Sequence, residues 1–115
     1  MVMDSLGSSL EDLMSKYKKF SLKTTLTLAD QILSRLESLH SKDYIHRDIK
    51  PENFLMGIHE NSHLVHLIDF GLSRPYRDSV SRKHSPFRAG RGLTGTVRYS
   101  SIVCSSNIFL HVLSL

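Results

Sequence analysis

Hydrophobic residues near the start of the chain recur with the period of an amphipathic helix. They are spaced three or four positions apart between residues 10 and 17, which predicts a short helix over roughly residues 9–18. Its apolar positions are Leu10, Leu13, Met14 and Tyr17. Ser8, followed by Glu11 three positions later, has the form of a capping box and is the expected start of this helix.

A second and longer apolar period follows Ser21, which is the expected N-cap of another helix. Its apolar positions are Leu22, Leu26, Ala29, Ile32, Leu33, Leu36 and Leu39. These residues fall on one face, so the pattern predicts a core helix with no chemical role of its own. His40 near its end suits the negative end of the helix dipole better than a metal site. The expected task of this helix is to place the loop that follows it.

The apolar runs beyond this helix are short and predict strands. Residues 54–56 and 64–68 are expected to pair as a small hairpin, because the connection between them is polar at positions 59–62. Such a hairpin would bring Asn53 and Asp69, which flank its two strands, near each other. At 115 residues the chain forms one domain at most. We therefore expect a mainly helical α+β fold.

Polar residues between the long helix and the hairpin suit the transfer of a phosphoryl group to a hydroxyl. Asp48 can accept the proton of a hydroxyl, and Lys50 can neutralise a migrating phosphate. Asn53 offers an uncharged oxygen to Mg²⁺, and Asp69 offers a carboxylate to the same cation. Either ligand alone is more often a turn former, but the pair in register with Asp48 favours a Mg²⁺ site.

The order and spacing of these residues match a known arrangement. Asp48 followed by Asp69-Phe70-Gly71 resembles the catalytic loop and metal-binding motif of protein kinases. A lysine two residues after the aspartate, here Lys50, resembles the serine/threonine class of these kinases. Stretches that closely resemble the casein kinase I family are 28–31, 40–42, 45–53, 54–57, 68–72 and 93–99. The resemblance spans about residues 1–102 and implies part of a protein-kinase-like fold. That part runs from the hinge, at residues 1–3, through the activation segment of the mainly helical C-terminal lobe.

The resemblance also implies an activity and its site residues. It implies an ATP-dependent serine/threonine protein kinase that transfers the γ-phosphoryl group of ATP to acidic or pre-phosphorylated proteins. Asp48 would position and deprotonate the hydroxyl, and Lys50 would neutralise the phosphoryl group. Thr96 stands where such kinases place a threonine that bonds to both of these residues. Asn53 and Asp69 would hold Mg²⁺ beside the nucleotide phosphates.

Basic residues are concentrated between positions 72 and 98. Seven cations and one acid give this segment a net charge of +6, while the whole chain carries +4. The cations are Arg74, Arg77, Arg82, Lys83, Arg88, Arg91 and Arg98. By resemblance Arg98 belongs to a pocket that reads a phosphate or acidic group on the substrate, a task that suits a planar guanidinium. A solvated basic loop is the alternative, and it is the preferred interpretation for Arg82 and Lys83.

Composition bounds the other possibilities. Cys104 is the only cysteine, so no intrachain disulfide can form, and the seven histidines lack metal-ligand spacing. By resemblance His46 and Arg47 support the loop and do not react. The N-terminus does not have the form of a signal peptide, and no apolar run approaches the roughly 20 residues of a membrane span. We expect a protein of the cytoplasm or nucleus without membrane contact. Nucleic-acid binding is a weaker interpretation, because no recognition motif accompanies the charge.

Parts of a complete kinase are not found in these 115 residues. A glycine-rich loop, a strand lysine and a helix glutamate would complete the phosphate cradle. Residues 103–115 form a divergent tail that is apolar and resembles no family, and it could promote self-association. We therefore expect the isolated chain to have little or no activity. The alternative is a non-catalytic module that competes for kinase substrates or regulators through residues 72–98.

Overall fold

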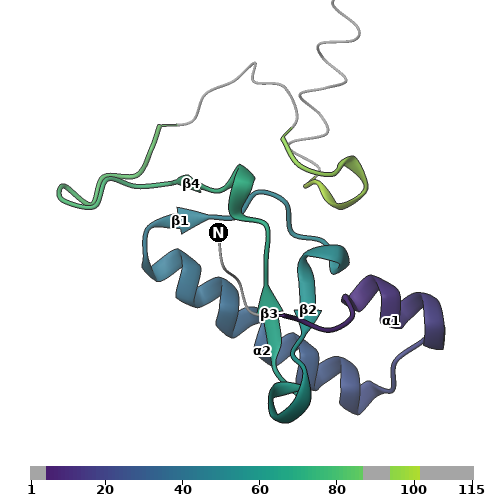
Figure 1. The fold of residues 1–115 in the computed structure, drawn as a ribbon. Helices are drawn as coiled ribbons and strands as arrows, with labels where there is room; N and C mark the ends of the chain where they lie inside the picture. Colours follow the sequence, from purple (N-terminus) through teal and green to yellow (C-terminus); the bar gives the residue numbers. More distant parts are fainter. Residues whose placement is uncertain (1–4, 87–93, 102–115) are drawn as a thin grey trace, which may run out of the picture.

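The computed structural model describes residues 5–86 and 94–101, in which two helices precede four short strands (Figure 1). The helices are α1 (Leu10–Tyr17) and α2 (Leu22–Ser41). The strands are β1 (Tyr44–Ile45), β2 (Phe54–Met56), β3 (Val65–Leu67) and β4 (Arg74–Pro75). Single turns of 3₁₀ helix lie at Pro51–Asn53, His59–Asn61, Phe70–Leu72 and Val97–Tyr99. This mixture fits the expected α+β class.

Helix α1 begins one residue later than the sequence predicts. Its N-cap is Ser9, whose side chain accepts from the Asp12 N–H at 3.1 Å, while the Asp12 carboxylate accepts from the Ser9 N–H at 3.0 Å. The predicted box of Ser8 and Glu11 is therefore wrong. The reason is tertiary: the Ser8 carbonyl accepts from the Met56 N–H at 3.0 Å, so the chain stays extended along β2 through Ser8.

Helix α2 has the predicted N-cap but not the predicted burial. The Ser21 hydroxyl accepts from the Thr24 N–H at 3.1 Å. Of the predicted apolar face, however, Leu22, Leu26 and Leu33 are 75%, 61% and 66% exposed. The main contacts of α2 are with β1 and β3, and its Leu28 and Ile32 pack against the core. No residue of α2 is itself buried, so the expected core helix borders the core and does not lie within it.

Polar side chains of α2 bind it to the hairpin. Gln31 donates to the His63 carbonyl at 2.9 Å and accepts from the Val65 N–H at 2.8 Å. Arg35 donates from Nε to the Val65 carbonyl at 3.0 Å. The core beside these bonds is small, and its buried apolar residues are Leu10, Phe54 and Val65. Specific hydrogen bonds therefore fix the hairpin against α2 where apolar burial is limited.

Two antiparallel pairs of strands flank the loop that follows α2. The predicted hairpin is confirmed, with β2 paired to β3 so that Leu55 lies opposite His66. The connection after β2 requires glycine at position 57, because a Cβ there would lie 2.1 Å from the Asn61 carbonyl oxygen. The second pair joins β1 to β4 and was not predicted; it places Ile45 opposite Arg74. The loop between β1 and β2 is thus held at both ends.

Several predicted features lie outside the described residues. They are the hinge-like residues 1–3, the cations Arg88 and Arg91, and the apolar tail at 103–115. Within 5–86 and 94–101, no helix combines the length and the apolar character that crossing a membrane requires.

Candidate active site

A buried histidine anchors the loop between β1 and β2. His46 is 1% exposed, and its Nε2 lies 2.9 Å from the Ile68 carbonyl, while its Nδ1 accepts from the Asp48 N–H at 3.3 Å. These partners place a ring proton on Nε2, which then donates to the Ile68 carbonyl. The ring also packs edge-on against Phe70, with centroids 5.4 Å apart. His46 therefore ties the loop to the end of β3.

Arg47 supports the same loop through a second contact. Its backbone lies in the left-handed region at φ 71°, which is uncommon for a residue with a side chain. Its Nε donates to the Leu72 carbonyl at 2.6 Å. Both residues thus occupy supporting positions, and the backbone that presents Asp48 is held by contacts to residues 68–72.

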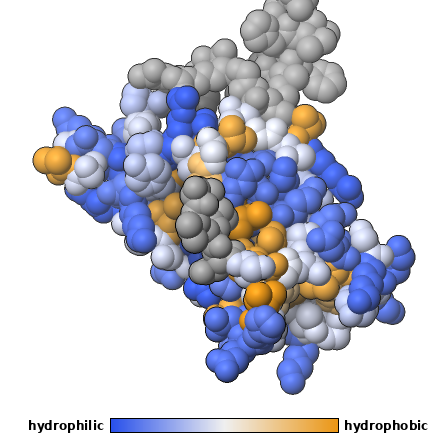
Figure 2. Space-filling view, viewed as in Figure 1, coloured by the Kyte–Doolittle hydropathy of each residue, from blue (hydrophilic) through white to orange (hydrophobic). Residues whose placement is uncertain are grey.

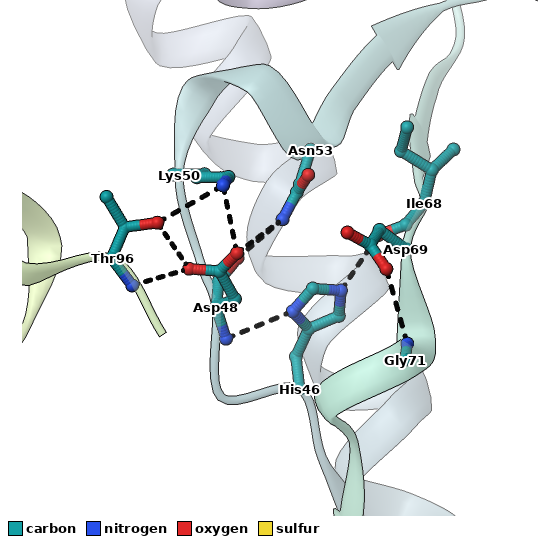
Figure 3. Close-up of polar contacts among 8 residues, drawn as sticks. All are labelled: His46, Asp48, Lys50, Asn53, Ile68, Asp69, Gly71 and Thr96. Carbon is teal, nitrogen blue, oxygen red and sulfur yellow. Dashed lines mark hydrogen bonds and ion pairs between the residues drawn. The ribbon is translucent and has the colours of Figure 1, made fainter. Parts of the chain in front are cut away.

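Asp48 lies at the centre of a closed set of polar contacts (Figure 3). Its Oδ1 accepts from both the backbone N–H and the hydroxyl of Thr96, each at 2.8 Å. Its Oδ2 lies 3.0 Å from the Lys50 ammonium, which in turn donates to the Thr96 hydroxyl at 3.1 Å. The structure therefore brings together Asp48, Lys50 and Thr96 from two segments far apart in sequence.

These contacts set the charge state of the pair. Burial raises the pKa of the Asp48 carboxyl, but the donors of Thr96 and Lys50 outweigh it and hold that pKa below its ordinary value. The hydrogen bond to Asp48 in turn raises the pKa of Lys50. At neutral pH the site therefore holds a carboxylate beside an ammonium group. Such a carboxylate can accept a hydrogen bond from a neutral hydroxyl.

Gly95 allows the Thr96 segment to approach the loop. Its φ is 95°, and a Cβ there would lie 2.4 Å from the Arg47 carbonyl oxygen and 3.3 Å from the Asp48 Oδ1. Only glycine fits this backbone contact without displacement. Sequence reasoning missed this role, although a lone glycine between two threonines was the available signal. The close approach of Gly95 goes together with the two bonds from Thr96 to Asp48.

Asn53 and Asp69 stand at neighbouring positions of the hairpin, as the sequence predicts. The Ile68 N–H donates to the Asn53 carbonyl at 3.0 Å. Asn53 is buried and donates from Nδ2 to the Asp48 carbonyl at 2.8 Å, which leaves its Oδ1 to serve as an acceptor. Asp69 is exposed at φ 60° and accepts from the Gly71 N–H through one oxygen. In Figure 3 both side chains lie on the side of Asp48 away from Thr96.

This donor set fits Mg²⁺ in chemistry and in number. One amide oxygen and one carboxylate are hard ligands, and Mg²⁺ commonly takes only one or two from the protein together with water and phosphate oxygens. Among the described residues no group of three or more histidine, cysteine, aspartate or glutamate side chains could enclose a metal ion. Any cation held here would therefore keep sites for ligands from a nucleotide.

The basic segment is partly neutralised within the molecule. Asp43 is 7% exposed at φ 69°; one of its carboxylate oxygens accepts from Arg77 Nε, and the other lies 2.7 Å from Arg82. Arg82 still lies on an exposed loop, as the solvated-loop interpretation expects, although that interpretation did not include the ion pair with Asp43. Sequence reasoning also missed Asp43, since nothing local marks its partners.

Arg98 is not drawn into the contacts around Asp48. It is exposed, and its guanidinium lies 5.6 Å from the centre of the Tyr99 ring. An exposed guanidinium beside an aromatic face is accessible to an anion from outside. Arg98 thus lies two positions beyond Thr96 in sequence, at an exposed position.

Comparison with known families adds one finding. A family model described as the protein kinase domain matches residues 1–101 of this chain.

Proposed function

The chain belongs to the protein kinase domain family, and from this premise we propose that it is a serine/threonine protein kinase of the casein kinase I type. The observation that supports this proposal best is the closed contact of Asp48, Lys50 and Thr96. It joins a carboxylate, an ammonium and a hydroxyl within 3.1 Å of one another. Such a group suits the alignment of a substrate hydroxyl against a phosphoryl group.

We assign the roles from the geometry of each side chain. The Asp48 carboxylate accepts the hydrogen bond of a serine or threonine hydroxyl and receives its proton as the oxygen bonds to phosphorus. The bond from phosphorus to the leaving ADP oxygen breaks in the same transfer. Lys50 stabilises negative charge on the phosphoryl oxygens, and Thr96 holds both residues in place.

Asn53 and Asp69 would hold Mg²⁺ next to the phosphates of ATP. The ion would supply positive charge for phosphate oxygens when bound. The Asn53 amide nitrogen is occupied by its bond to the Asp48 carbonyl, which leaves the amide oxygen for the cation. The second oxygen of Asp69 serves as the other protein ligand.

Arg98 supports the proposal that the substrates are acidic or already phosphorylated proteins. Its exposed guanidinium follows closely after Thr96 in sequence and can bind two phosphate oxygens at once. Arg77 and Arg82 are less suited, because both are already paired with the carboxylate of Asp43.

These 115 residues alone are expected to transfer phosphate poorly. Phosphoryl transfer depends on positioning and charge stabilisation, and the sequence holds neither a glycine-rich phosphate loop in its usual place nor the lysine of the following strand. The alternative, a non-catalytic module acting through residues 72–98, predicts substrate capture that survives Asp48→Asn but is lost in Arg98→Ala.

A ¹⁵N amide NMR titration tests the nucleotide half of the site. Adding Mg²⁺ with ATP should shift the amide signals of Asn53 and Asp69, and Asp69→Asn should abolish these shifts. The matched control is Asp30→Asn, which removes an exposed carboxylate from α2 and should leave the shifts intact. Equal shifts in both variants would contradict the assigned Mg²⁺ ligands.

A chimera tests the activity itself. The upper lobe of a casein kinase I relative would be fused ahead of Met1, and transfer to a serine peptide would be compared with and without a phosphate already on the peptide. We expect faster transfer to the phosphorylated peptide, and Arg98→Ala should remove this preference. Lys23→Ala, which removes an exposed cation from α2, should not. A chimera without transfer would overturn the kinase proposal.

A further inference from the structure

An apolar cavity of about 350 Å³ opens beside the loop that carries Asp48. Its walls include Met14 of α1, Ile32 of α2, Ile49 and Pro51 of the loop, and Tyr99. The charged residues of the lining are Glu11 and Lys50. Because the Lys50 ammonium faces Asp48, the cavity offers mainly hydrocarbon to an occupant.

The walls of this cavity are incompletely buried. Met14, Ile49 and Tyr99 are each 38–40% exposed, although large apolar side chains gain free energy when they leave water. Figure 2, viewed as Figure 1, shows apolar surface between the β2–β3 hairpin and α1, framed by hydrophilic residues. Apolar surface that gathers in a concave site is typical of a place where another apolar segment binds.

The sequence that follows Tyr99 has the composition such a site requires. Residues 102–115 contain no aspartate, glutamate, lysine or arginine. Their large apolar members are Ile102, Val103, Ile108, Phe109, Leu110, Val112, Leu113 and Leu115. Ile102 is three positions from Tyr99, which is itself a wall of the cavity, and three residues span at most about 11 Å.

We propose that residues 102–115 dock their apolar side chains in this cavity. The covalent connection favours this occupant, because a short tether holds a segment near its site at an effective concentration of about a millimolar. A second copy of the chain would have to compete with it from dilute solution. The absence of charge in the segment matches walls that offer little to an ion.

Docking has a consequence for the candidate active site. Tyr99 ends the single helical turn Val97–Tyr99, and the Tyr99 N–H donates to the Thr96 carbonyl at 3.0 Å. Covering Tyr99 therefore restrains the segment whose Thr96 holds Asp48. This inference depends on the cavity and the segment, and it holds whether or not the chain transfers phosphate.

The single cysteine provides a direct test. A nitroxide attached to Cys104 in the full chain should broaden the NMR signals of the Met14 and Ile32 methyl groups, which line the cavity. The Leu33 methyl groups, which lie on the exposed side of α2, are the internal comparison and should lose less intensity than those of Ile32. Unchanged Met14 and Ile32 signals would overturn the proposal.

Two further samples separate the possible occupants. In a mixture of nitroxide-bearing chain with isotope-labelled Cys104→Ser chain, broadening at Met14 would mean that a second copy fills the cavity, which overturns the proposal. In the single-chain experiment, Phe109→Asp with Leu110→Asp should abolish the broadening. Ser105→Asp with Ser106→Asp adds the same charge at polar positions and should preserve it. Equal broadening in both double variants would also count against docking.

Discussion

Two buried aspartates lie on either side of β1, and each holds a later part of the chain. Asp43 binds Arg77 and Arg82, whereas Asp48 binds Thr96 and Lys50. Their exposed fractions are nearly equal, at 7% and 8%. Burial alone therefore does not distinguish a structural carboxylate from a candidate reactive one.

The partners of the two carboxylates make the distinction. Each oxygen of Asp43 faces a guanidinium, a group whose charge is permanent and whose shape suits a fixed ion pair. Asp48 instead faces a hydroxyl, a backbone N–H, a single ammonium on a flexible stem and, at 3.4 Å, the amide nitrogen of Asn53. Contacts of the second kind can be exchanged for a substrate hydroxyl without leaving two cations unpaired.

The largest expected effect comes from removing the charge of Asp48 in the active chimera. Asp48→Asn should lower kcat about 10³-fold, the range of a lost general base, which corresponds to about 4 kcal/mol. In either orientation the NH₂ group of the new amide would face a hydrogen-bond donor, from Lys50 or from Thr96. Initial rates of phosphate transfer at saturating ATP measure this loss.

Asp43→Asn in the same chimera is the comparison that sharpens this result. It should leave kcat within about a few fold of the parent, because no contact of Asp43 includes the group around Asp48. A loss of kcat as large as that of Asp48→Asn would mean that the two carboxylates do not differ as their partners indicate.

The next effect is on stability, for which we expect Asp43 to matter more than Asp48. Asp43→Ala should lower the free energy of unfolding by about 3 kcal/mol, since it leaves Arg77 partly buried without its partner. This value lies at the low end for a broken buried pair, because the Arg82 side chain is 54% exposed. Urea denaturation followed by circular dichroism measures the change. Asp30→Ala, on the exposed surface of α2, should cost far less, and equal costs would disprove a structural role for Asp43.

Gly95→Ala tests how the second segment reaches Asp48. The added Cβ meets the Arg47 carbonyl oxygen at 2.4 Å and an unfavourable φ of 95°, so we expect a loss of about 2 kcal/mol in the free energy of unfolding. The Thr96 amide signal should move at the same time as its bond to Asp48 lengthens. Gly71→Ala is the control, because its Cβ would meet only a carboxylate oxygen of Asp69, at 3.2 Å. An unmoved Thr96 signal would show that this contact is not needed.

The same comparison shows which features can be predicted from sequence. The N-cap at Ser21 and the hairpin of β2 and β3 follow from patterns within a few residues, and both are confirmed. Asp48, Lys50 and Thr96 could be named together only through the family resemblance, because a loop and a residue nearly fifty positions later share no local pattern. The structure brings them into contact.

The features that were missed depend on contacts between distant segments. Asp43 finds its arginines 34 and 39 positions away, and no periodicity marks such a pair. Ser9 replaces Ser8 as the N-cap because β2 holds the preceding backbone extended. The exposure of Leu26 and Leu33 has a similar origin, since a helical pattern indicates which face is apolar but not what covers it.

The smallest expected effect is a dependence of stability on pH that arises from Asp48. The pKa of its carboxyl is lowered in the folded chain from an ordinary value of 3.8. The folded state therefore binds this proton less readily than the unfolded state, so the contribution is present above pH 3.8 and is lost as the pH falls through the lower folded value. Lys50 has the opposite sign: its pKa is raised above 10.5, so its contribution is present below that pH and is lost as the pH rises through the folded value.

Urea midpoints measured from about pH 7 down to about pH 3 should fall less steeply in Asp48→Asn than in the parent chain. Part of the slope should remain, because the pKa values of Asp12 and Asp78 are also lowered, by hydrogen bonds from Ser9 and Ser81 respectively. A slope unchanged by Asp48→Asn would mean that Thr96 and Lys50 do not favour the charged carboxylate, and the contrast with Asp43 would then rest on geometry alone.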